Sequence, residues 1–243
     1  MTLPVYVDRA LSAVAEGASL TLRGDEGRHA ATVRRTKPGE QIDVVNGTGL
    51  RARIEVTGAT KSEVTGRVLA VTQEQAAGPH ITLVQALAKG GRDEQAVETA
   101  TEYGVDAVIP WQSARCIAQW PDAARAAKGR ARWEATALAA AKQSRRSFVP
   151  EVADVRTTKQ LPEALAGMDA VFVCHESGTV PITEHLGETY GKVAIVVGPE
   201  GGITDDEVAF LESAGARTVL LGEHVLRSAT AGPWAIAVIR SRS

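Results

Sequence analysis

The spacing of apolar residues changes abruptly near residue 73, and this change constrains the fold more than any other feature of the sequence. From Val5 to Thr72, short segments alternate apolar and polar residues with a period of two, which is typical of half-buried strands. After a polar stretch that closes with Gly78 and Pro79, longer apolar runs alternate with stretches of helical period. The chain of 243 residues is therefore predicted to contain a small β-barrel domain over residues 1–73 and an α/β domain over 79–243.

Five segments are predicted to be the strands of the first domain: 5–7, 19–22, 41–45, 51–56 and 64–71. The sequence Asn46-Gly47-Thr48-Gly49 lies between two of them and contains residues that tolerate a positive φ, so it predicts a hairpin turn. A helical insert is expected over about residues 25–35.

The apolar runs of the second domain are nearly continuous, which is typical of strands that are buried on both faces of a parallel sheet. These runs cover residues 81–88, 107–111, 170–174, 193–197 and 218–221. Stretches of helical period separate them, including an alanine-rich one around 135–141 and an apolar one from Pro233 to Ile239. The pattern predicts an α/β domain with a parallel sheet.

Charge is distributed unevenly along the chain. The formal net charge is −2, which by itself argues against a nucleic-acid partner. Residues 1–73, however, contain ten basic and eight acidic residues, and residues 122–146 contain seven basic residues against only Asp122 and Glu134. This basic segment fits either a solvated helix face or a surface that meets RNA.

The two cysteines, Cys116 and Cys174, are far apart and lack the spacing of a disulfide framework or a zinc site. Both are predicted to be small buried apolar residues. Asp8 and Arg9 stand where a signal peptide needs its apolar region, and no apolar run approaches the ~20 residues of a membrane span. We therefore expect a cytoplasmic protein with no metal and no membrane partner.

The most informative segment is a glycine-rich loop, Gly198-Pro199-Glu200-Gly201-Gly202, which follows an apolar run. Thr204 and Glu207 have the spacing of a capping box, so a helix is expected to begin there. Such a loop often binds phosphate, but Glu200 and the acidic residues 205–207 would repel a pyrophosphate. The loop favours a ligand with a flat neutral base and a cationic centre, and a simple turn is the alternative.

A second segment has the same order of strand, loop and helix, because the run 218–221 precedes a loop over 222–227. A third loop begins with His175 and Glu176 after the run 170–174. Ligands bind beyond the carboxyl ends of strands in α/β sheets, so these loops are expected to form one site. His175 titrates in a range that suits a base, but a lone histidine is more often structural and is not among our catalytic candidates.

These loops resemble the signature of the SPOUT methyltransferases, and in particular that of the ribosomal RNA small-subunit methyltransferase E family. The resemblance is carried by Gly198–Gly202 and by Leu221-Gly222-x-x-Val225-Leu226-Arg227-x-x-Thr230-Ala231. The first domain is similar to that family's PUA-like barrel at His29-x-x-x-Val33-Arg34, Gly39 and Gly47-Thr48-Gly49. The second domain is similar to its catalytic domain at Lys89-Gly90, Glu102-x-Gly104, Ile109-Pro110, Arg115, Gln143-Ser144 and Arg146-x-x-x-Pro150.

The resemblance implies a parallel α/β sheet with a deep trefoil knot near the C-terminus, preceded by an RNA-binding PUA-like barrel. It implies S-adenosyl-L-methionine as cofactor, methylation of N3 of one uridine in 16S rRNA of the small ribosomal subunit, and a homodimer packed through the knotted domain. The residues that it assigns to the cofactor are Val173, Cys174, His175, Val197, Gly198, Pro199, Glu200, Gly201, Gly202, Leu221, Gly222, Val225, Leu226, Arg227 and Thr230. The residues that it assigns to RNA are Arg9, Arg28, His29, Arg34, Arg35, Lys89, Arg115, Gln143, Arg145 and Arg146.

Two arginines are the catalytic candidates. Arg227 could stabilise the uracil anion that forms when the N3 proton leaves, or could bind a neighbouring phosphate, and a salt bridge to the C-terminal helix is the alternative. Arg146, together with Gln143, could position RNA. Glu200 could contact the cofactor or act as a base, although hydrogen bonds that stabilise its loop are the favoured role.

The chain departs from the family pattern at seven positions, so no catalytic role is assigned to them. The family usually has arginine near Pro4 and at His224, lysine at Thr99, and glutamate at Ala114, Ala139, Lys142 and Ala229. Two alternatives to the preferred function stay open. The chain could be a SPOUT enzyme that acts on another RNA or on a ribose 2'-hydroxyl, or a non-catalytic RNA-binding assembly factor.

Overall fold

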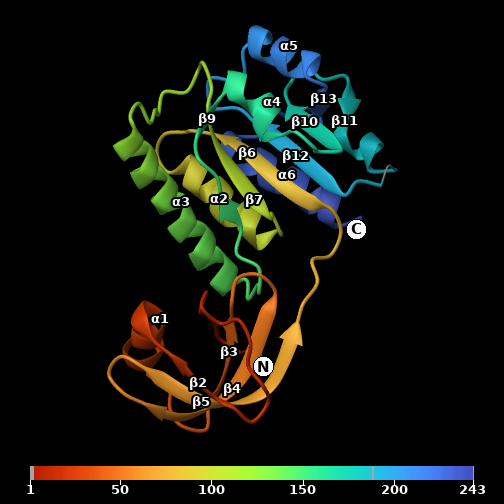
Figure 1. The fold of residues 1–243 in the computed structure, drawn as a ribbon. Helices are drawn as coiled ribbons and strands as arrows, with labels where there is room; N and C mark the ends of the chain where they lie inside the picture. The colour runs from red at the N-terminus through yellow and green to blue at the C-terminus, as the bar shows by residue number, and fades with distance from the viewer. Residues whose placement is uncertain (1–2, 188, 243) are drawn as a thin grey trace. The chain divides into compact units, whose positions relative to one another are not determined.

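The computed structural model describes residues 3–187 and 189–242, which form two compact units (Figure 1). The first unit extends to Ala76 and also includes Ala141–Val149. The second unit contains Ala77–Ala140 and the chain from Pro150 onward. Residues 141–149 were predicted to belong to the second domain, whereas in the structure they pack with the first unit.

Polar contacts explain why this segment joins the first unit. The Lys142 ammonium pairs with the Glu26 carboxylate at 2.5 Å, and both side chains are about four-fifths buried. Arg51 donates a hydrogen bond from Nη2 to the carbonyl of Arg145 at 2.9 Å, and the backbone N–H of Val149 donates to the carbonyl of Gly47 at 3.0 Å. Sequence proximity to the second domain could not indicate these long-range pairings.

Five strands form the sheet of the first unit, in the order β1-β3-β4-β5-β2. They are β1 (Val5–Val7), β2 (Ser19–Leu22), β3 (Gln41–Val45), β4 (Leu50–Ala59) and β5 (Val64–Gln73). Strands β1 and β3 are parallel, and the other neighbours are antiparallel. The apolar residues of their inner face, such as Ile42, Ile54 and Val64, are fully buried and form the core of this unit. All five strands were predicted, and β4 and β5 are somewhat longer than expected.

The predicted hairpin turn between β3 and β4 is confirmed. The Asn46 Oδ1 atom accepts hydrogen bonds from the backbone N–H groups of Thr48 and Leu50, at 2.8 and 3.0 Å. Gly47 and Gly49 have φ values of 85° and 103°, which side chains rarely tolerate. The predicted helical insert is divided into helix α1 (Gly24–Arg28) and a π-helical turn, η1 (His29–Val33).

All neighbouring strands of the second unit are parallel, in the order β11-β13-β10-β12-β6-β7-β8, with β9 paired to β7. The strands are β6 (His80–Ala86), β7 (Ala107–Gln112), β8 (Glu151–Val152), β9 (Arg156–Thr157), β10 (Ala170–Cys174), β11 (Val180–Pro181), β12 (Lys192–Val197) and β13 (Arg217–Leu220). The central strand β12 is buried from Val193 to Val197, as its continuous apolar run predicts. The predicted α/β class with a parallel sheet is therefore confirmed.

Five helices and two 3-10 turns lie between or after these strands in the described part of the chain. They are α2 (Arg92–Glu102), α3 (Ala123–Gln143), η2 (Thr158–Gln160), α4 (Leu161–Ala164), η3 (Ile182–Gly187), α5 (Asp205–Ser213) and α6 (Ser228–Arg240). Helices α2 and α6 pack against each other, and α6 also packs on β6 and β12 (Figure 1). A Cβ atom at Gly232 would lie 2.7 Å from Cδ1 of Leu83, so α6 approaches the sheet closely at this glycine.

Helix α6 begins earlier than predicted. Because proline favours the first turn of a helix, Pro233 indicated a start there, but the helix begins at Ser228 after the extended residue Arg227 (φ −71°, ψ 154°). Pro233 lies inside the helix and cannot donate one backbone hydrogen bond. Burial of residues such as Ala235 and Ile236 against the sheet outweighs that loss.

Candidate functional site

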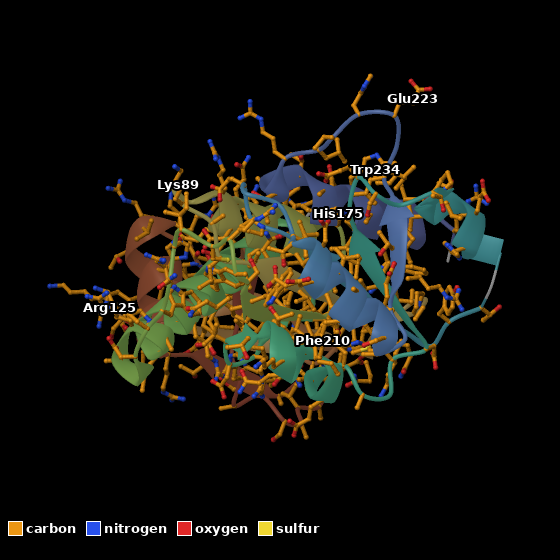
Figure 2. All side chains as sticks on the ribbon, turned by 90° about the horizontal axis from the view of Figure 1, so that it is seen from above. Lys89, Arg125, His175, Phe210, Glu223 and Trp234 are labelled. Carbon is orange, nitrogen blue, oxygen red and sulfur yellow. The ribbon has the colours of Figure 1, made fainter. Side chains whose placement is uncertain are left out.

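A cavity of about 820 Å³ opens at the carboxyl ends of β10, β12 and β13. Because these three parallel strands are adjacent, the loops that follow them converge there. One wall is the glycine-rich loop, defined as residues 198–203, and the other is the Glu223 loop, defined as residues 222–227. Figure 2 shows Glu223 at the tip of a loop that projects from the second unit, with His175 further inside.

The structure brings together most of the residues that were predicted to bind a cofactor. The predicted residues that line the cavity are Cys174, His175, Val197, Gly198, Pro199, Glu200, Gly201, Gly202, Leu221, Gly222, Val225, Leu226 and Arg227. Val173 is fully buried inside β10, and Thr230 is an exposed residue of α6. These two residues do not line the cavity.

Several lining residues were not among those predicted to bind the cofactor. Most of them are neighbours of predicted positions: Glu176, Ile203, Val219, Leu220, Glu223, His224, Ser228 and Ala231. Arg92 is different, because it comes from the start of α2 and lies far away in the sequence. Its placement depends on the pairing of β6 with β12, which no local pattern specifies.

Glycines give the first wall its shape. Gly202 has a φ of 76°, and its N–H donates a hydrogen bond to the carbonyl of Pro199 at 2.9 Å. A Cβ atom at Gly198 would lie 2.6 Å from Cγ1 of Ile203, a residue that is only 2% exposed. The loop therefore folds tightly over a core residue, and a side chain at Gly198 would displace it.

Glu207 joins the end of this loop to two other segments. The predicted capping box is confirmed, since Glu207 Oε2 accepts hydrogen bonds from the N–H and hydroxyl of Thr204 and the Glu207 N–H donates to Thr204 Oγ1. Its Oε1 atom accepts from the N–H of Ala114 at 2.9 Å and from the Thr158 hydroxyl at 2.6 Å. Burial by itself raises the pKa of Glu207. The hydrogen bonds from Thr158, Ala114 and Thr204 lower the pKa by more than burial raises it, so the net pKa lies below its ordinary value.

The glycine-rich loop is also held at its centre. Arg115 donates a hydrogen bond from Nη1 to the carbonyl of Gly201 at 3.0 Å. Glu200 Oε1 accepts from the backbone N–H of Lys89 at 3.2 Å and from Nη1 of Arg92 at 3.0 Å. Two segments that are distant from this loop in the sequence, residues 89–92 and Arg115, therefore hold this wall in place.

The Glu223 loop has few contacts by comparison. Residues 222–225 and Arg227 are exposed, and Val225 is 82% exposed. The carbonyl of Arg227 accepts hydrogen bonds from the N–H groups of Thr230 and Ala231, which begins α6. Within the described part of the chain, the Arg227 guanidinium makes no ion pair, so the expected alternative of a salt bridge to the C-terminal helix is absent there.

Two residues that line the cavity, His175 and Cys174, are limited in their chemistry by their surroundings. His175 Nδ1 lies 2.8 Å from the Ser177 hydroxyl, and its side chain is only 8% exposed. Burial raises the pKa of the Cys174 thiol to about 12, so this thiol stays protonated near neutral pH. The prediction of burial is confirmed for Cys116, whereas Cys174 is only partly buried and lines the cavity.

The cavity can accept a ligand with apolar, cationic and hydrogen-bonding parts. Val197, Leu221 and Leu226 supply apolar surface, while the carboxylates of Glu176 and Glu223 favour a cation. Ser228 also lines the cavity, but its hydroxyl oxygen is buried and, within the described residues, has no hydrogen-bond partner.

The residues predicted to contact RNA are divided between the two units. Arg9, Arg28, Arg34 and Arg35 are exposed in the first unit, and His29 is partly buried there. The segment 141–149 adds Gln143, Arg145 and Arg146 to the same unit. Lys89 and Arg115 belong to the second unit and are exposed. Arg146, a catalytic candidate, does not line the cavity.

Much of the basic charge on α3 is neutralised. Arg130 pairs with Glu134 at 2.9 Å and with Asp154 at 2.8 Å, and Arg132 pairs with Glu94 at 2.7 Å. These contacts support the interpretation of this helix as a solvated face with long cationic side chains.

The described residues contain neither a candidate metal cluster nor a helix that could cross a membrane. Residues 3–187 and 189–242 contain no group of three or more histidine, cysteine or acidic side chains that could hold a metal ion. Within the same ranges, every helix is too short or too polar to cross a membrane.

Two family models match the chain. Residues 75–240 match an RNA methyltransferase domain, and residues 22–69 match an RNA methyltransferase PUA domain. The second match supports a PUA-like fold for the first unit.

Named relatives and solved structures agree with these matches. The ribosomal RNA small subunit methyltransferase E of Mycobacterium bovis is 45% identical over 92% of this chain and 86% of its own length. The protein of the same name from Bacillus subtilis is 31% identical over 96% of this chain and 94% of its own length.

A structure of ribosomal RNA small subunit methyltransferase E from Neisseria gonorrhoeae, bound to S-adenosyl methionine, is 28% identical, with a TM-score of 0.84 over 99% of this chain and 98% of that one. A putative methyltransferase from Legionella pneumophila, also with bound S-adenosyl methionine, is 25% identical, with a TM-score of 0.87 over the same shares. The resemblance inferred from the two loop motifs is therefore confirmed, and the chain belongs to the ribosomal RNA small subunit methyltransferase E family.

Proposed function

We propose that this protein transfers a methyl group from S-adenosyl-L-methionine to N3 of one uridine in 16S rRNA of the small ribosomal subunit. The observation that carries the proposal is the cavity at the carboxyl edge of the parallel sheet, whose two walls are the two motif loops. Two similar structures contain this cofactor, and the named relatives are methyltransferases of small-subunit ribosomal RNA.

The cavity residues fit the cofactor. The volume of about 820 Å³ lies within the range of about 300–1,000 Å³ that is common for small-molecule sites. Leu221 and Leu226 offer apolar contacts to a flat base, and the exposed backbone of the glycine-rich loop offers hydrogen bonds. The carboxylates of Glu176 and Glu223 suit a positively charged ligand, whereas Glu200 is already paired with Arg92. When bound, the cofactor supplies a methyl group on a cationic sulfur.

The protein's main contribution to such a reaction is to hold the uracil in line with the methyl group, because orientation alone supplies much of the acceleration. Arg227 remains a candidate for stabilising charge on the uracil oxygens, since its guanidinium is exposed at the cavity and makes no ion pair with a described residue. Arg146 and Gln143 remain candidates for positioning RNA, because they lie in the first unit together with the exposed residues Arg9, Arg28, Arg34 and Arg35.

The first unit is proposed to bind the RNA backbone. Its family model is a PUA domain of RNA methyltransferases, and Arg9, Arg28, Arg34 and Arg35 are exposed on it. Two described residues other than glycine have positive φ values, Arg35 at 54° and Arg145 at 61°, and both belong to this unit. Backbone strain of this kind often occurs at functional positions.

A trefoil knot in the second unit is part of the proposal. Strand β13 lies beyond β10, on the side away from β12 and β6. After β13, the chain forms the Glu223 loop and returns to place α6 against β12 and β6. The C-terminal segment thus crosses back over strands that come earlier in the chain, which supports a knot in which this segment passes through a loop of the chain. Homodimerisation through this unit and a cytoplasmic location are proposed from the family alone.

The test is to incubate the protein and radiolabelled S-adenosyl-L-methionine with purified small subunits and, separately, with naked 16S rRNA, and then to identify the labelled nucleoside. We expect label in 3-methyluridine and in no other nucleoside. Label in a ribose 2'-O-methyl group, or only in tRNA, would contradict the proposed substrate. If calorimetry detects no binding of the cofactor, the alternative of a non-catalytic RNA-binding factor is favoured instead.

A further inference from the structure

An arginine and a glutamate from distant parts of the chain meet at the cavity. Arg92, the first residue of α2, and Glu200, in the glycine-rich loop, are separated by 108 positions in the sequence, and both line the cavity. Nη1 of Arg92 donates a hydrogen bond to Oε1 of Glu200 at 3.0 Å. The Arg92 side chain is 41% exposed and that of Glu200 is 20% exposed, so both charges are partly shielded from water.

The backbone fixes the position of this pair. The N–H of Lys89 donates a second hydrogen bond to the same Glu200 oxygen, at 3.2 Å. The segment before α2 is held in turn by Asp93, which is 3% exposed and accepts a hydrogen bond from the N–H of Ala88 at 3.3 Å. No described residue donates to the second carboxylate oxygen of Glu200, and Arg92 retains donors beyond Nη1.

The pair presents a hydrogen-bond pattern that complements one edge of uracil. The imide edge of uracil has an N3–H donor between two carbonyl acceptors. Arg92 can donate to a carbonyl oxygen, and Glu200 can accept from N3–H beside it. Cytosine has an unprotonated N3 at this edge, so it would place an acceptor against the Glu200 carboxylate and be rejected.

We propose that Arg92 and Glu200 bind the imide edge of the target uracil, and that Glu200 removes the N3 proton. This inference rests on the proposed function, and it adds the group that takes the proton and the feature that selects uracil. The N3–H bond breaks as the proton moves to a Glu200 oxygen, and its electron pair stays on the uracil, with charge shared by the carbonyl oxygens near Arg92. A bond then forms between N3 and the methyl carbon, the bond between that carbon and sulfur breaks, and sulfur keeps the electron pair. Glu200 later returns its proton to water.

Other groups at the cavity are less suited to this step. His175 is largely buried, and its Nδ1 is already engaged with Ser177. The Cys174 thiol stays protonated near neutral pH. Arg227 lies on the exposed Glu223 loop, where no contact with a described residue fixes its guanidinium. Glu200 is the carboxylate of this cavity that both a neighbouring cation and a backbone donor hold in place.

The first test is Glu200→Gln. The amide oxygen can still accept hydrogen bonds from Lys89 and Arg92, so the loop geometry is kept, but the amide cannot take a proton. We expect kcat for methylation of naked 16S rRNA to fall by about 100-fold or more, with an unchanged dissociation constant for S-adenosyl-L-methionine in calorimetry. The matched control is Glu134→Gln, which alters an exposed pair with Arg130 on α3 and should leave both quantities unchanged.

The second test determines whether Glu200→Gln loses kcat because it cannot remove the N3 proton. In 16S rRNA transcribed with 5-fluorouridine, the N3 proton is more acidic, so the Glu200→Gln variant should recover most of its lost kcat relative to the unaltered protein. The variant's kcat on ordinary RNA should also rise with pH over a range where that of the unaltered protein is level. A purely structural role for Glu200 would give neither the fluorouridine rescue nor the altered pH profile.

The third test concerns Arg92. Arg92→Ala and Arg92→Lys should both lower kcat, with the lysine variant retaining more activity because it keeps one cationic donor. In the presence of S-adenosylhomocysteine, the unaltered protein should bind RNA with the target uridine more tightly than RNA with cytidine at that position. The alanine variant should lose this preference.

Two results would overturn the inference. One is Glu200→Gln with normal kcat on RNA that the unaltered protein methylates to 3-methyluridine. The other is weaker cofactor binding with normal kcat at saturation, which would assign Glu200 to the cofactor. If the unaltered protein forms no 3-methyluridine at all, the proposed function itself is wrong. The same assay therefore distinguishes failure of the proposed function from failure of the roles given to Arg92 and Glu200.

Discussion

The two walls of the cavity differ in how firmly the rest of the protein holds them. The glycine-rich loop and Glu207, which follows it, are held by hydrogen bonds from three other segments, which contain Lys89, Ala114 with Arg115, and Thr158. The Glu223 loop is exposed over most of its length. Among the described residues, its backbone hydrogen bonds are those that the carbonyl of Arg227 accepts from Thr230 and Ala231 at the start of α6. One wall therefore has a defined position before any ligand binds, whereas the other can adjust.

This difference indicates a division of roles. Groups that must meet a reacting atom need a fixed geometry, which the glycine-rich loop and its partners provide. A loop with few contacts can move aside and then close over a bound molecule. These roles can be tested by measuring how strongly each wall is held. The four tryptophans, Trp111, Trp120, Trp133 and Trp234, all belong to the second unit. Their fluorescence therefore reports on the unit that contains the cavity.

The largest effect is expected from Glu207→Ala. It removes the capping box and leaves the Ala114 N–H and the Thr158 hydroxyl without their acceptor. We expect the free energy of unfolding of the second unit to fall by roughly 3 kcal/mol, measured by urea denaturation with tryptophan fluorescence. Glu207→Gln should cost less, because its amide oxygen can still accept. Equal stability of the alanine variant and the unaltered protein would contradict the role of Glu207 as an anchor.

The next effect concerns Gly198→Ala. The new Cβ atom would lie 2.6 Å from Ile203 Cγ1, so the loop or the buried isoleucine must shift, at a cost of about 1–3 kcal/mol. Because the loop moves, affinity for S-adenosyl-L-methionine should fall about tenfold or more in calorimetry. Gly58→Ala in β4 is the control, since nothing lies within 4 Å of its added Cβ. If Gly198→Ala binds the cofactor normally, the glycine-rich loop is less constrained than the structure indicates.

Low pH should reduce the contribution of the Glu207 carboxylate to the free energy of unfolding. The pKa of Glu207 is lowered in the folded state, so its contribution to stability is complete above the ordinary value of 4.5 and is lost as pH falls through the lower folded-state value. The stability difference between the unaltered protein and Glu207→Gln should therefore shrink as pH is lowered from about 6 toward about 3. Urea unfolding followed by tryptophan fluorescence measures this stability difference at each pH. A difference that does not change with pH would exclude the Glu207 carboxylate as its source.

The smallest effect is expected in the Glu223 loop. Val225→Ala removes two methyl groups from a residue that is 82% exposed, so the free energy of unfolding should change by less than about 0.5 kcal/mol. Backbone amides of residues 223–226 should also exchange hydrogen faster than those of residues 201–204, as measured by mass spectrometry. Similar exchange rates in the two loops would remove the distinction between the walls.

Local patterns in the sequence were sufficient for much of the fold. The alternating residues of β3 and β4, the turn at Asn46–Gly49 and the continuous apolar run of β12 were each assigned correctly, because backbone geometry and burial are set by neighbouring residues. The helix start at Thr204 was also correct, since a capping box involves only four adjacent positions. The start of α6 was missed because Pro233 is tolerated within a buried helix, where packing outweighs a lost hydrogen bond.

The candidate site, like the fold, was predicted only in part from local patterns in the sequence. The sequence by itself determined the two loops, since glycines and acidic residues follow two apolar runs that end at the same edge of a parallel sheet. Only the tertiary structure brought Arg92 to Glu200 and placed Ala114 and Thr158 against Glu207, because strand order decides which distant segments become neighbours. It also placed residues 141–149 with the first unit, through the Lys142–Glu26 pair. Contacts between distant residues depend on the packing of the whole chain, and no short segment contains that information.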